Sequence, residues 1–190
     1  MKRLVVIGAG GHGRSVAEAA AASGEYTITG FLDDAHLELT QVWSIPVLGA
    51  LGEYARWHEE ADFVVVAIGN NRLRQRLTEE LQAAGFVLAT IIHPRAVVSP
   101  TASIGAGCTI MAGAIIGTEA CVGEGVIVNA GAIVDHHAKV GDFGHLGVRA
   151  AMAGGSVLGH GAWMQAGAAL GYGVTIPEHV VLQPGEARST

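Results

Sequence analysis

The chain has 190 residues, of which half are hydrophobic and 15% charged, and its formal net charge is −6. This composition supports a buried core and excludes a disordered chain, while 28 glycines without a Gly-X-Y period do not fit collagen. The acidic balance argues against nucleic acid or an anionic membrane surface as the main partner. No apolar run reaches the roughly 18 residues of a membrane span, and the first apolar stretch is too short for a secretion signal. With only two cysteines and no CxxC pair, we expect a reduced, cytoplasmic protein.

The first ninety residues alternate strand-like and helix-like segments. The pattern predicts strands over residues 3–7, 26–32 and 63–68, and helices over residues 14–22, 51–60 and 71–84. The strands are nearly continuous apolar runs, which indicates a parallel sheet covered by helices. We therefore predict a Rossmann-like α/β domain over residues 1–90.

A glycine-rich loop, GAGGHG at residues 8–13, lies between the first predicted strand and the first predicted helix. Glycines let the backbone approach a phosphate, and a helix N-terminus supplies free N–H donors. Asp33 follows Gly13 at about 20 residues, the distance expected of a ribose-binding acid. A tight turn without a ligand is the alternative. Because the α/β part has too few strands for both halves of a dinucleotide site, a nucleotide sugar fits better than NAD.

The third predicted strand ends in Gly69, Asn70 and Asn71, at the sheet edge where open parallel sheets bind ligands. Asn71 is equally suited to cap the helix that follows. These asparagines alone do not separate the two interpretations.

From Ile92 to Leu182 the period changes to six. Sixteen aliphatic or Met residues recur at this spacing without an insertion, and the residue two places before each is small or β-branched. A hexapeptide β-helix produces this period, with three hexads in each coil. Anchors three hexads apart, such as Ile104, Val122 and Val140, should then stack inside. Glycines that follow the anchors are expected to supply the corner conformations. We predict a parallel β-helix over residues 91–190.

Polar residues are scarce in this region, so the segment Asp135-His136-His137 and His145 stand out. A neutral imidazole can accept a proton from an incoming nucleophile near neutral pH. His136 lies near a corner and His145 points outward, so neither is expected in the interior. Solvated surface histidines remain an alternative. No metal site is expected, because adjacent histidines do not easily ligate one ion and no third ligand is apparent.

Together, GAGGHG, FLDD (31–34), AIGNN (67–71), the hexapeptide region and VDHHAKVGDFGH (134–145) resemble one family over nearly the whole chain. It is the family of bacterial sugar acetyltransferases of the sialic-acid O-acetyltransferase and UDP-4-amino-sugar N-acetyltransferase type (NeuD/PglD-like). The resemblance implies a left-handed β-helix, an exception to the usual right-handed crossover, a homotrimer, and acetyl-CoA as the acetyl donor.

The resemblance also implies residue roles. His136 corresponds to the general base, and His137 stands where the family has an acidic residue that raises the basicity of the base. His136 therefore either lacks this help or is oriented by Asp135 or another group. His145 and the backbone around Ala166 correspond to acetyl-CoA contacts. The positions that hold the nucleotide sugar correspond to Gly10, Gly11, His12, Asp33, Asp34 and Gly69.

Several functions fit these residues. The first is acetyl transfer from acetyl-CoA to an amine on a nucleotide-linked amino sugar, and O-acetylation of a sugar hydroxyl would use the same base. A third is a nucleotide-sugar-binding protein with weakened catalysis, because the family normally continues past Thr190 into a coil and tail that contribute to coenzyme A binding. A NAD-dependent oxidoreductase would lack a catalytic domain. Outward residues such as Val148, Trp163 and Ala166 leave apolar surface, which favours a trimer.

Overall fold

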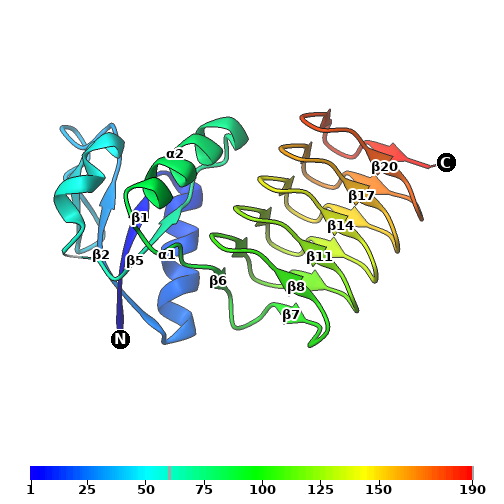
Figure 1. Cartoon of the computed structure of the whole chain (residues 1–190), viewed down its shortest axis with the longest axis horizontal. Helices are drawn as coiled ribbons and strands as arrows, with labels where there is room; N and C mark the ends of the chain where they lie inside the picture. Colours follow the sequence, from blue (N-terminus) through cyan, green and yellow to red (C-terminus); the bar gives the residue numbers. More distant parts are fainter. Residues whose placement is uncertain (60, 190) are drawn as a thin grey trace.

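The computed structural model describes residues 1–59 and 61–189 and consists of an α/β part followed by a β-helix (Figure 1). The α/β part contains β1 (Lys2–Ile7), α1 (Gly11–Ser23), β2 (Tyr26–Leu32), β3 (Gln41–Val42), β4 (Ile45–Gly49), the 3₁₀ helix η1 (Leu51–Trp57), β5 (Phe63–Val66) and α2 (Asn71–Ala83). The sheet order is β3-β4-β2-β1-β5. All pairings are parallel except that of β3 with β4.

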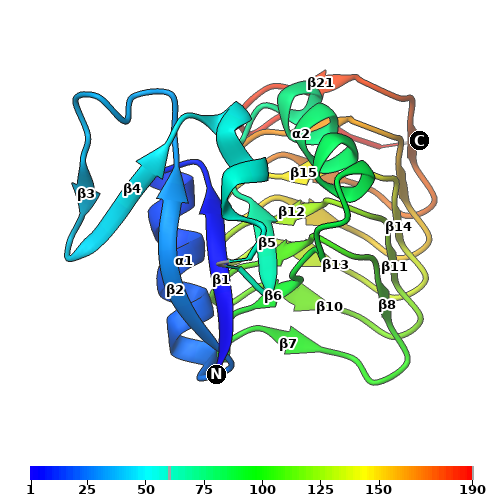
Figure 2. The same cartoon turned by 60° about the vertical axis from the view of Figure 1, so that its left-hand side comes forward.

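Helices cover both faces of this sheet, as its continuous apolar strands predicted. Leu4 and Val6 of β1 pack with α1 on one face, whereas Val5 and Ile7 pack with α2 and η1 on the other. Figure 2 shows α1 running alongside β1 and β2. The alanines of α1 let it lie close to the sheet, since they fill little space between the two elements.

Two elements differ from the sequence prediction. The helix predicted over 51–60 is the shorter 3₁₀ helix Leu51–Trp57, with no buried residue in it, and Glu60 lies outside the described residues. Gly52 lowers the stability of a helix here, and the apolar residues Leu51, Tyr54 and Trp57 are only partly buried against the sheet, so packing stabilises a longer helix little. Strands β3 and β4 were not predicted. They form because β4 pairs with β2, a contact between segments distant in sequence.

The β-helix confirms the predicted coil of three hexads. In each of its three sheets a strand pairs in parallel with the strand one coil further on, as Val122 does with Val140. Its short strands are β6 (Ile91–Ile92), β7 (Val97–Val98), β8 (Ser103–Ile104), β9 (Thr109–Ile110), β10 (Ile115–Ile116), β11 (Cys121–Val122), β12 (Ile127–Val128), β13 (Ile133–Val134), β14 (Lys139–Val140), β15 (His145–Leu146), β16 (Ala151–Met152), β17 (Val157–Leu158), β18 (Trp163–Met164), β19 (Ala169–Leu170), β20 (Thr175–Ile176), β21 (Val181–Leu182) and β22 (Ala187–Arg188).

The anchor residues and the small residues two places before them fill the interior of the coils, from Cys108 to Leu182. Ile92 departs from this pattern, because it is 39% exposed whereas its neighbour Ile91 is buried. The reason is its position. β6 is the edge strand of its sheet, so Ile92 has no preceding coil to cover it, and Ile91 packs into the core of the α/β part instead.

The predicted role of the glycines after the anchors is wrong. The left-handed conformation, with φ between +56° and +72°, falls on the third residue after an anchor, whether this is Gly107, Glu119 or His137. The glycine directly after an anchor is required for another reason. A Cβ at Gly117 would lie 2.8 Å from the backbone nitrogen of His136 in the next coil, which leaves no room for a side chain.

The α/β part packs against the sheet β21-β18-β15-β12-β9-β6, whose outward residues Thr109 and Ile127 are buried. Arg74 of α2 joins the two parts and is only 1% exposed. Its guanidinium donates to the carbonyl oxygens of Gly125 and Phe143 in the β-helix, both at 2.7 Å, and to that of Ile68 at 2.9 Å. Burial lowers the pKa of Arg74 to about 10, so the group stays charged at neutral pH.

Candidate active site

The glycine loop forms a cavity of about 340 Å³ at the carboxyl edge of the sheet. It brings together five of the six residues predicted to hold the nucleotide sugar. The lining consists of Gly8, Gly10, Gly11, His12, Gly13, Asp33, Leu51, Ala67, Ile68 and Gly69.

Each glycine of the loop has a distinct structural role. Gly8 adopts φ +107°, a conformation that side chains rarely allow, and a Cβ at Gly13 would collide with the Gly8 carbonyl oxygen. Gly13 therefore lets α1 start close to β1. A Cβ on Gly10 or Gly11 would meet no atom within 4 Å. The fold would thus accept a side chain at either position. Glycine at both positions keeps this side of the cavity open.

The two aspartates of this region hold the loops around the cavity. Asp33 lines it, but its carboxylate oxygens already accept hydrogen bonds from the backbone N–H groups of Ala9 (2.7 Å) and Ala35 (2.9 Å). Asp34 does not line the cavity, and its carboxylate accepts a hydrogen bond from the Leu51 N–H at 3.1 Å. Asp33 therefore shapes the glycine loop through its backbone contacts, in addition to facing the cavity.

His12 places an unpaired polar atom against this cavity. Its Nε2 is buried without a hydrogen-bond partner among the described residues. Burial, together with the charge of Arg74, lowers the pKa of His12 to about 4, so the imidazole is neutral at physiological pH. The ring can donate or accept a hydrogen bond there without contributing a charge.

His145 points away from the interior of the β-helix, as predicted, but it is not solvated. The side chain is buried where the α/β part covers β15, with Nδ1 3.3 Å from the Gly69 carbonyl oxygen. Its ring stacks on Trp163 at 5.1 Å between centroids. Burial lowers the pKa of His145 to about 3, with smaller contributions from Arg74 and His12. Trp163, predicted to be exposed for a trimer contact, is half-buried by this stacking.

His136 lies outside the coils at the corner that follows β13. Gly154, one coil further on, makes room for its imidazole, because a Cβ at Gly154 would collide with the His136 ring. Tyr172, at the same position of the coil after that, places its ring 6.4 Å from that of His136. The imidazole therefore lies against the backbone of the next coil, with half of its side-chain surface exposed.

The side chain next to His136 is His137, and His137 in turn contacts Glu119. The Nδ1 atoms of His136 and His137 are 3.1 Å apart, and His137 Nε2 lies 2.9 Å from Glu119 Oε2. Asp135 accepts the backbone N–H of His136 at 2.7 Å, while its other oxygen is 3.8 Å from His136 Nε2, beyond hydrogen-bond distance. Glu119 was missed by the sequence analysis, although its position one coil before His137 was a usable signal.

The His136 cluster and the glycine-loop cavity lie on different sides of the chain. His136 follows the sheet β22-β19-β16-β13-β10-β7, whereas the α/β part covers the sheet that contains β15. Ala166 is exposed and precedes β19, so it lies at the opposite edge of that first sheet from His136. A single chain does not bring His136, Ala166 and the cavity together.

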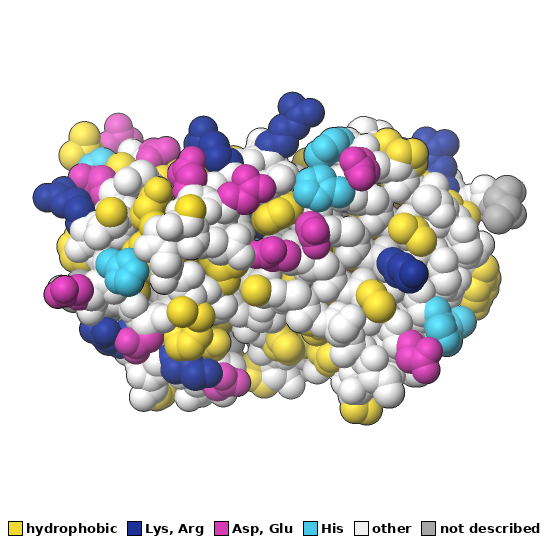
Figure 3. All heavy atoms as spheres, in the orientation of Figure 1, with side chains coloured by type: hydrophobic (Ala, Val, Ile, Leu, Met, Phe, Trp, Pro, Cys, Tyr) yellow, Lys and Arg dark blue, Asp and Glu magenta, His cyan; other side chains and the backbone are white. Residues whose placement is uncertain are grey.

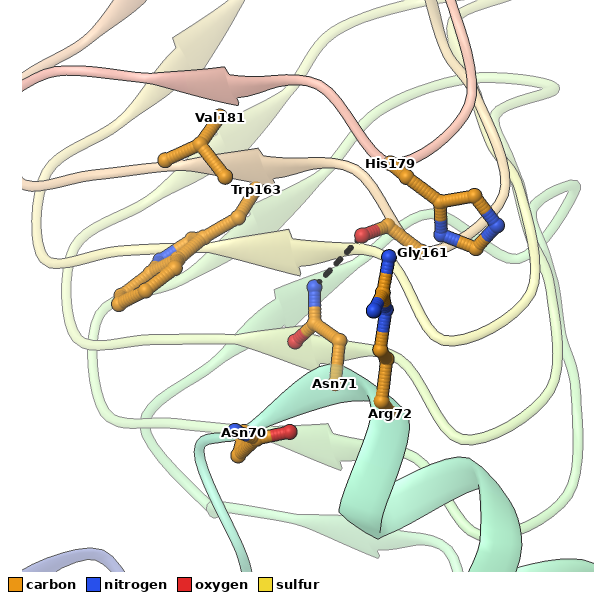
Figure 4. A pocket seen from close by; sticks show the side chains of 7 residues that line it. All are labelled: Asn70, Asn71, Arg72, Gly161, Trp163, His179 and Val181. Carbon is orange, nitrogen blue, oxygen red and sulfur yellow. Dashed lines mark hydrogen bonds between the residues drawn. The ribbon is translucent and has the colours of Figure 1, made fainter.

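A second cavity, of about 260 Å³, lies between the start of α2 and the β-helix (Figure 4). Asn71 donates to the Gly161 carbonyl oxygen at 2.9 Å and accepts from Arg74, while Asn70 caps α2 by accepting the Leu73 N–H. The helix cap is thus Asn70, and Asn71 links the two parts of the chain.

On the face shown in Figure 3, acidic and basic side chains are interspersed. Within residues 1–59 and 61–189, no cluster of three His, Cys, Asp or Glu residues is arranged to hold a metal ion. In the same residues, no helix is both long and apolar enough to cross a membrane.

Two comparisons by sequence match parts of the chain. Residues 3–81 match the PglD N-terminal domain. A UDP-N-acetylbacillosamine N-acetyltransferase from Bacillus subtilis is 35% identical over 114 residues, which cover 59% of this chain and 52% of that protein. The match thus spans about half the length of that relative.

Two solved structures match over nearly their full length. The acetyltransferase domain of PglB from Neisseria gonorrhoeae has a TM-score of 0.94 and 38% identity, covering all of this chain and 92% of that one. PerB from Caulobacter crescentus, solved with CoA and GDP-perosamine, has a TM-score of 0.92 and 37% identity, covering 98% and 88%. The chain therefore belongs to the NeuD/PglD-like family of sugar acetyltransferases, in which a Rossmann-like domain precedes a left-handed β-helix.

Proposed function

We propose that the protein transfers an acetyl group from acetyl-CoA to an amine on a nucleotide-linked amino sugar. The observation that carries this proposal is the near full-length match to PerB, solved with CoA and GDP-perosamine. The PglB domain was also solved with acetyl coenzyme A, and that structure covers 97% of this chain. The cavity at the glycine loop and the exposed imidazole of His136 are the two features of this chain that suit the reaction.

The nucleotide sugar is proposed to bind at the glycine-loop cavity. Gly10 and Gly11 leave space for phosphates near the N-terminus of α1, whose free N–H groups favour anions. The unpaired Nε2 of His12 is available to a hydroxyl or phosphate oxygen of the ligand. Asp33 and Asp34 hold the surrounding loops, and Gly69 contributes its backbone at the edge that faces His145.

His136 is the proposed general base. As the amine nitrogen bonds to the acetyl carbon, it transfers one proton to His136 Nε2. The carbon–sulfur bond then breaks, and the same proton leaves with the coenzyme A thiolate as the thiol. The products are the N-acetyl sugar and coenzyme A, so the base is regenerated at each turnover.

A trimer would complete this site. The sheet β22-β19-β16-β13-β10-β7 presents Val97, Ile115 and Ile133 outward, with exposures of 62%, 39% and 37%. This apolar flat side is the kind of surface that another copy of the chain would cover. Because His136 and Ala166 flank it at opposite edges, a neighbouring copy would bring its Ala166 edge to the His136 edge of the first.

Acetyl-CoA is proposed to bind in the cleft that two such edges form. Ala166 is small and exposed, so its backbone is accessible to a ligand. The neutral ring of His145 would contribute a hydrogen bond and not a charge, since its pKa is lowered to about 3. His145 also contacts Gly69, which connects the proposed coenzyme side to the sugar cavity.

A panel of UDP-, GDP- and CMP-linked amino sugars, incubated with acetyl-CoA, tests this function. We expect release of coenzyme A and formation of an N-acetyl sugar with one of these acceptors. Acetylation of a hydroxyl sugar but of no amine would instead identify an O-acetyltransferase. Nucleotide-sugar binding without turnover would identify a binding protein with weakened catalysis.

A further inference from the structure

We propose that Glu119 is the positioning residue for His136 and acts on it through His137. This inference rests on the proposed role of His136 as the general base. In this arrangement the imidazole of His137 connects the base, His136, to the carboxylate of Glu119 one coil away.

The charge of Glu119 and the hydrogen bond between the two histidines together favour one arrangement of protons. An ionised Glu119 carboxylate favours a proton on His137 Nε2, 2.9 Å from its oxygen, because an unprotonated ring nitrogen would direct its lone pair at the negative charge. A neutral His137 then has a bare Nδ1, which accepts from His136 Nδ1 across 3.1 Å. His136 is thereby left with a bare Nε2, the nitrogen that must take the proton from the amine.

The coil register builds this arrangement. Glu119 lies three hexads before His137, so both occupy the same corner in successive coils. Both have left-handed backbone, with φ of +57° and +59°, and the His137 N–H donates to the Thr118 carbonyl oxygen at 2.9 Å. These contacts fix the two backbones relative to each other and hold the side chains in register.

The carboxylate also favours the charged product of proton transfer. Once Nε2 has taken the proton, the imidazolium of His136 is stabilised through His137 by the charge of Glu119. Asp135 is the other carboxylate near the ring, at 3.8 Å from Nε2, and the Tyr172 ring lies 6.4 Å from the His136 ring. Asp135 makes its hydrogen bond to the backbone of His136, so it does not fix which ring nitrogen carries the proton.

The variants E119Q and E119G test the proposal. E119Q keeps the size of the side chain and removes its charge, and E119G keeps the corner, since glycine occupies most equivalent positions. For both variants we expect kcat to fall 10- to 100-fold, as when a residue that orients a catalytic side chain is lost. The KM for the amino sugar should be unchanged. The acidic limb of the kcat/KM profile should move to lower pH, because the imidazolium loses a stabilising charge. E178Q, an exposed carboxylate elsewhere on the β-helix, is the matched control.

A second background separates positioning from a structural effect. H137E places a carboxylate directly beside His136, and Glu119 itself shows that this corner accepts glutamate. In the H137E variant, E119Q should not lower kcat further, because the connection to His136 no longer passes through residue 119. An equal loss in both backgrounds overturns the proposal. So does D135N, if it moves the acidic limb while E119Q does not.

Ring ¹⁵N chemical shifts give a readout that is independent of turnover. We expect His136 to carry its proton on Nδ1 in the parent and to become a mixture of tautomers in E119G. An unchanged tautomer in E119G overturns the proposal, even if H136A abolishes turnover and so supports the base. If H136A keeps parent-like turnover, the base assignment fails, and the tautomer of E119G still decides whether Glu119 positions the ring.

Discussion

Acidification should weaken the contact between the α/β part and the β-helix, because two histidines are buried there as neutral rings. His12 and His145 have their pKa values lowered to about 4 and about 3 from 6.5, mainly by burial. A lowered folded pKa means that the unfolded chain binds more protons at mildly acidic pH. Stability is therefore present above pH 6.5 and is lost progressively as the pH falls towards 4.

The magnitude at pH 5 depends almost entirely on the unfolded chain. Both rings are still neutral in the folded protein at this pH, whereas the solution is about 1.5 pH units below the pKa of each unfolded histidine. Each ring then costs about 2 kcal/mol of folding free energy relative to pH 7.5. Other groups titrate in the same range, so the contribution of His145 is isolated by comparison with the variant H145Q.

Urea unfolding at pH 7.5 and pH 5.0, at one fixed protein concentration, measures this effect. We expect H145Q to be less stable than the parent at pH 7.5, because it loses the stacking on Trp163. Its further loss on acidification should nevertheless be smaller than that of the parent, by about 2 kcal/mol. H58N, which removes an exposed histidine outside this contact, is the matched control. If H145Q and the parent lose equal stability between the two pH values, the buried neutral ring is refuted.

Other variants test the proposed site. H136A should lower kcat by ~10²–10⁴, the usual contribution of a positioned proton acceptor, without a change in unfolding free energy, as steady-state kinetics and urea unfolding would show. G154A should also lower kcat, because its methyl group displaces the His136 ring; parent-like turnover would contradict the packing argument. D33A removes the acceptor of two backbone N–H groups, so we expect a stability loss of about 1–3 kcal/mol and weaker nucleotide-sugar binding by calorimetry. I133E places a charge on the apolar flat side and should give a monomer by light scattering, whereas a trimeric parent and a trimeric variant would exclude that side as the interface.

The β-helix could be predicted from sequence because its cause is local and repeated. Each anchor and the small residue before it must share a narrow interior, and this requirement recurs with every hexad along the chain. The same repetition places Glu119 beneath His137, although only the side-chain geometry shows that they touch. The corner conformations were assigned to the wrong glycines, since the sequence does not separate a backbone clash from a left-handed φ.

The α/β part was predicted where a strand and its helix are adjacent in sequence. β2 matches the predicted residues 26–32, and the glycine loop, Asp33 and Gly69 gather at one sheet edge because parallel strands end there together. The short strand β4 was missed because its stability comes from pairing with β2 and not from its own residues.

The sequence by itself determined two architectures, the order in which they follow each other, and the residue types suited to acetyl transfer. Only the tertiary structure decided how the two parts meet. Arg74 is buried because it satisfies backbone carbonyls from both parts, and the pattern of α2 shows only that it shares a face with Leu77 and Leu81. His145 resembles a solvated residue in sequence, yet it is neutral and buried because the α/β part covers β15. Burial of a polar group depends on what packs against it from elsewhere in the chain, and a repeat pattern does not indicate which segment that is.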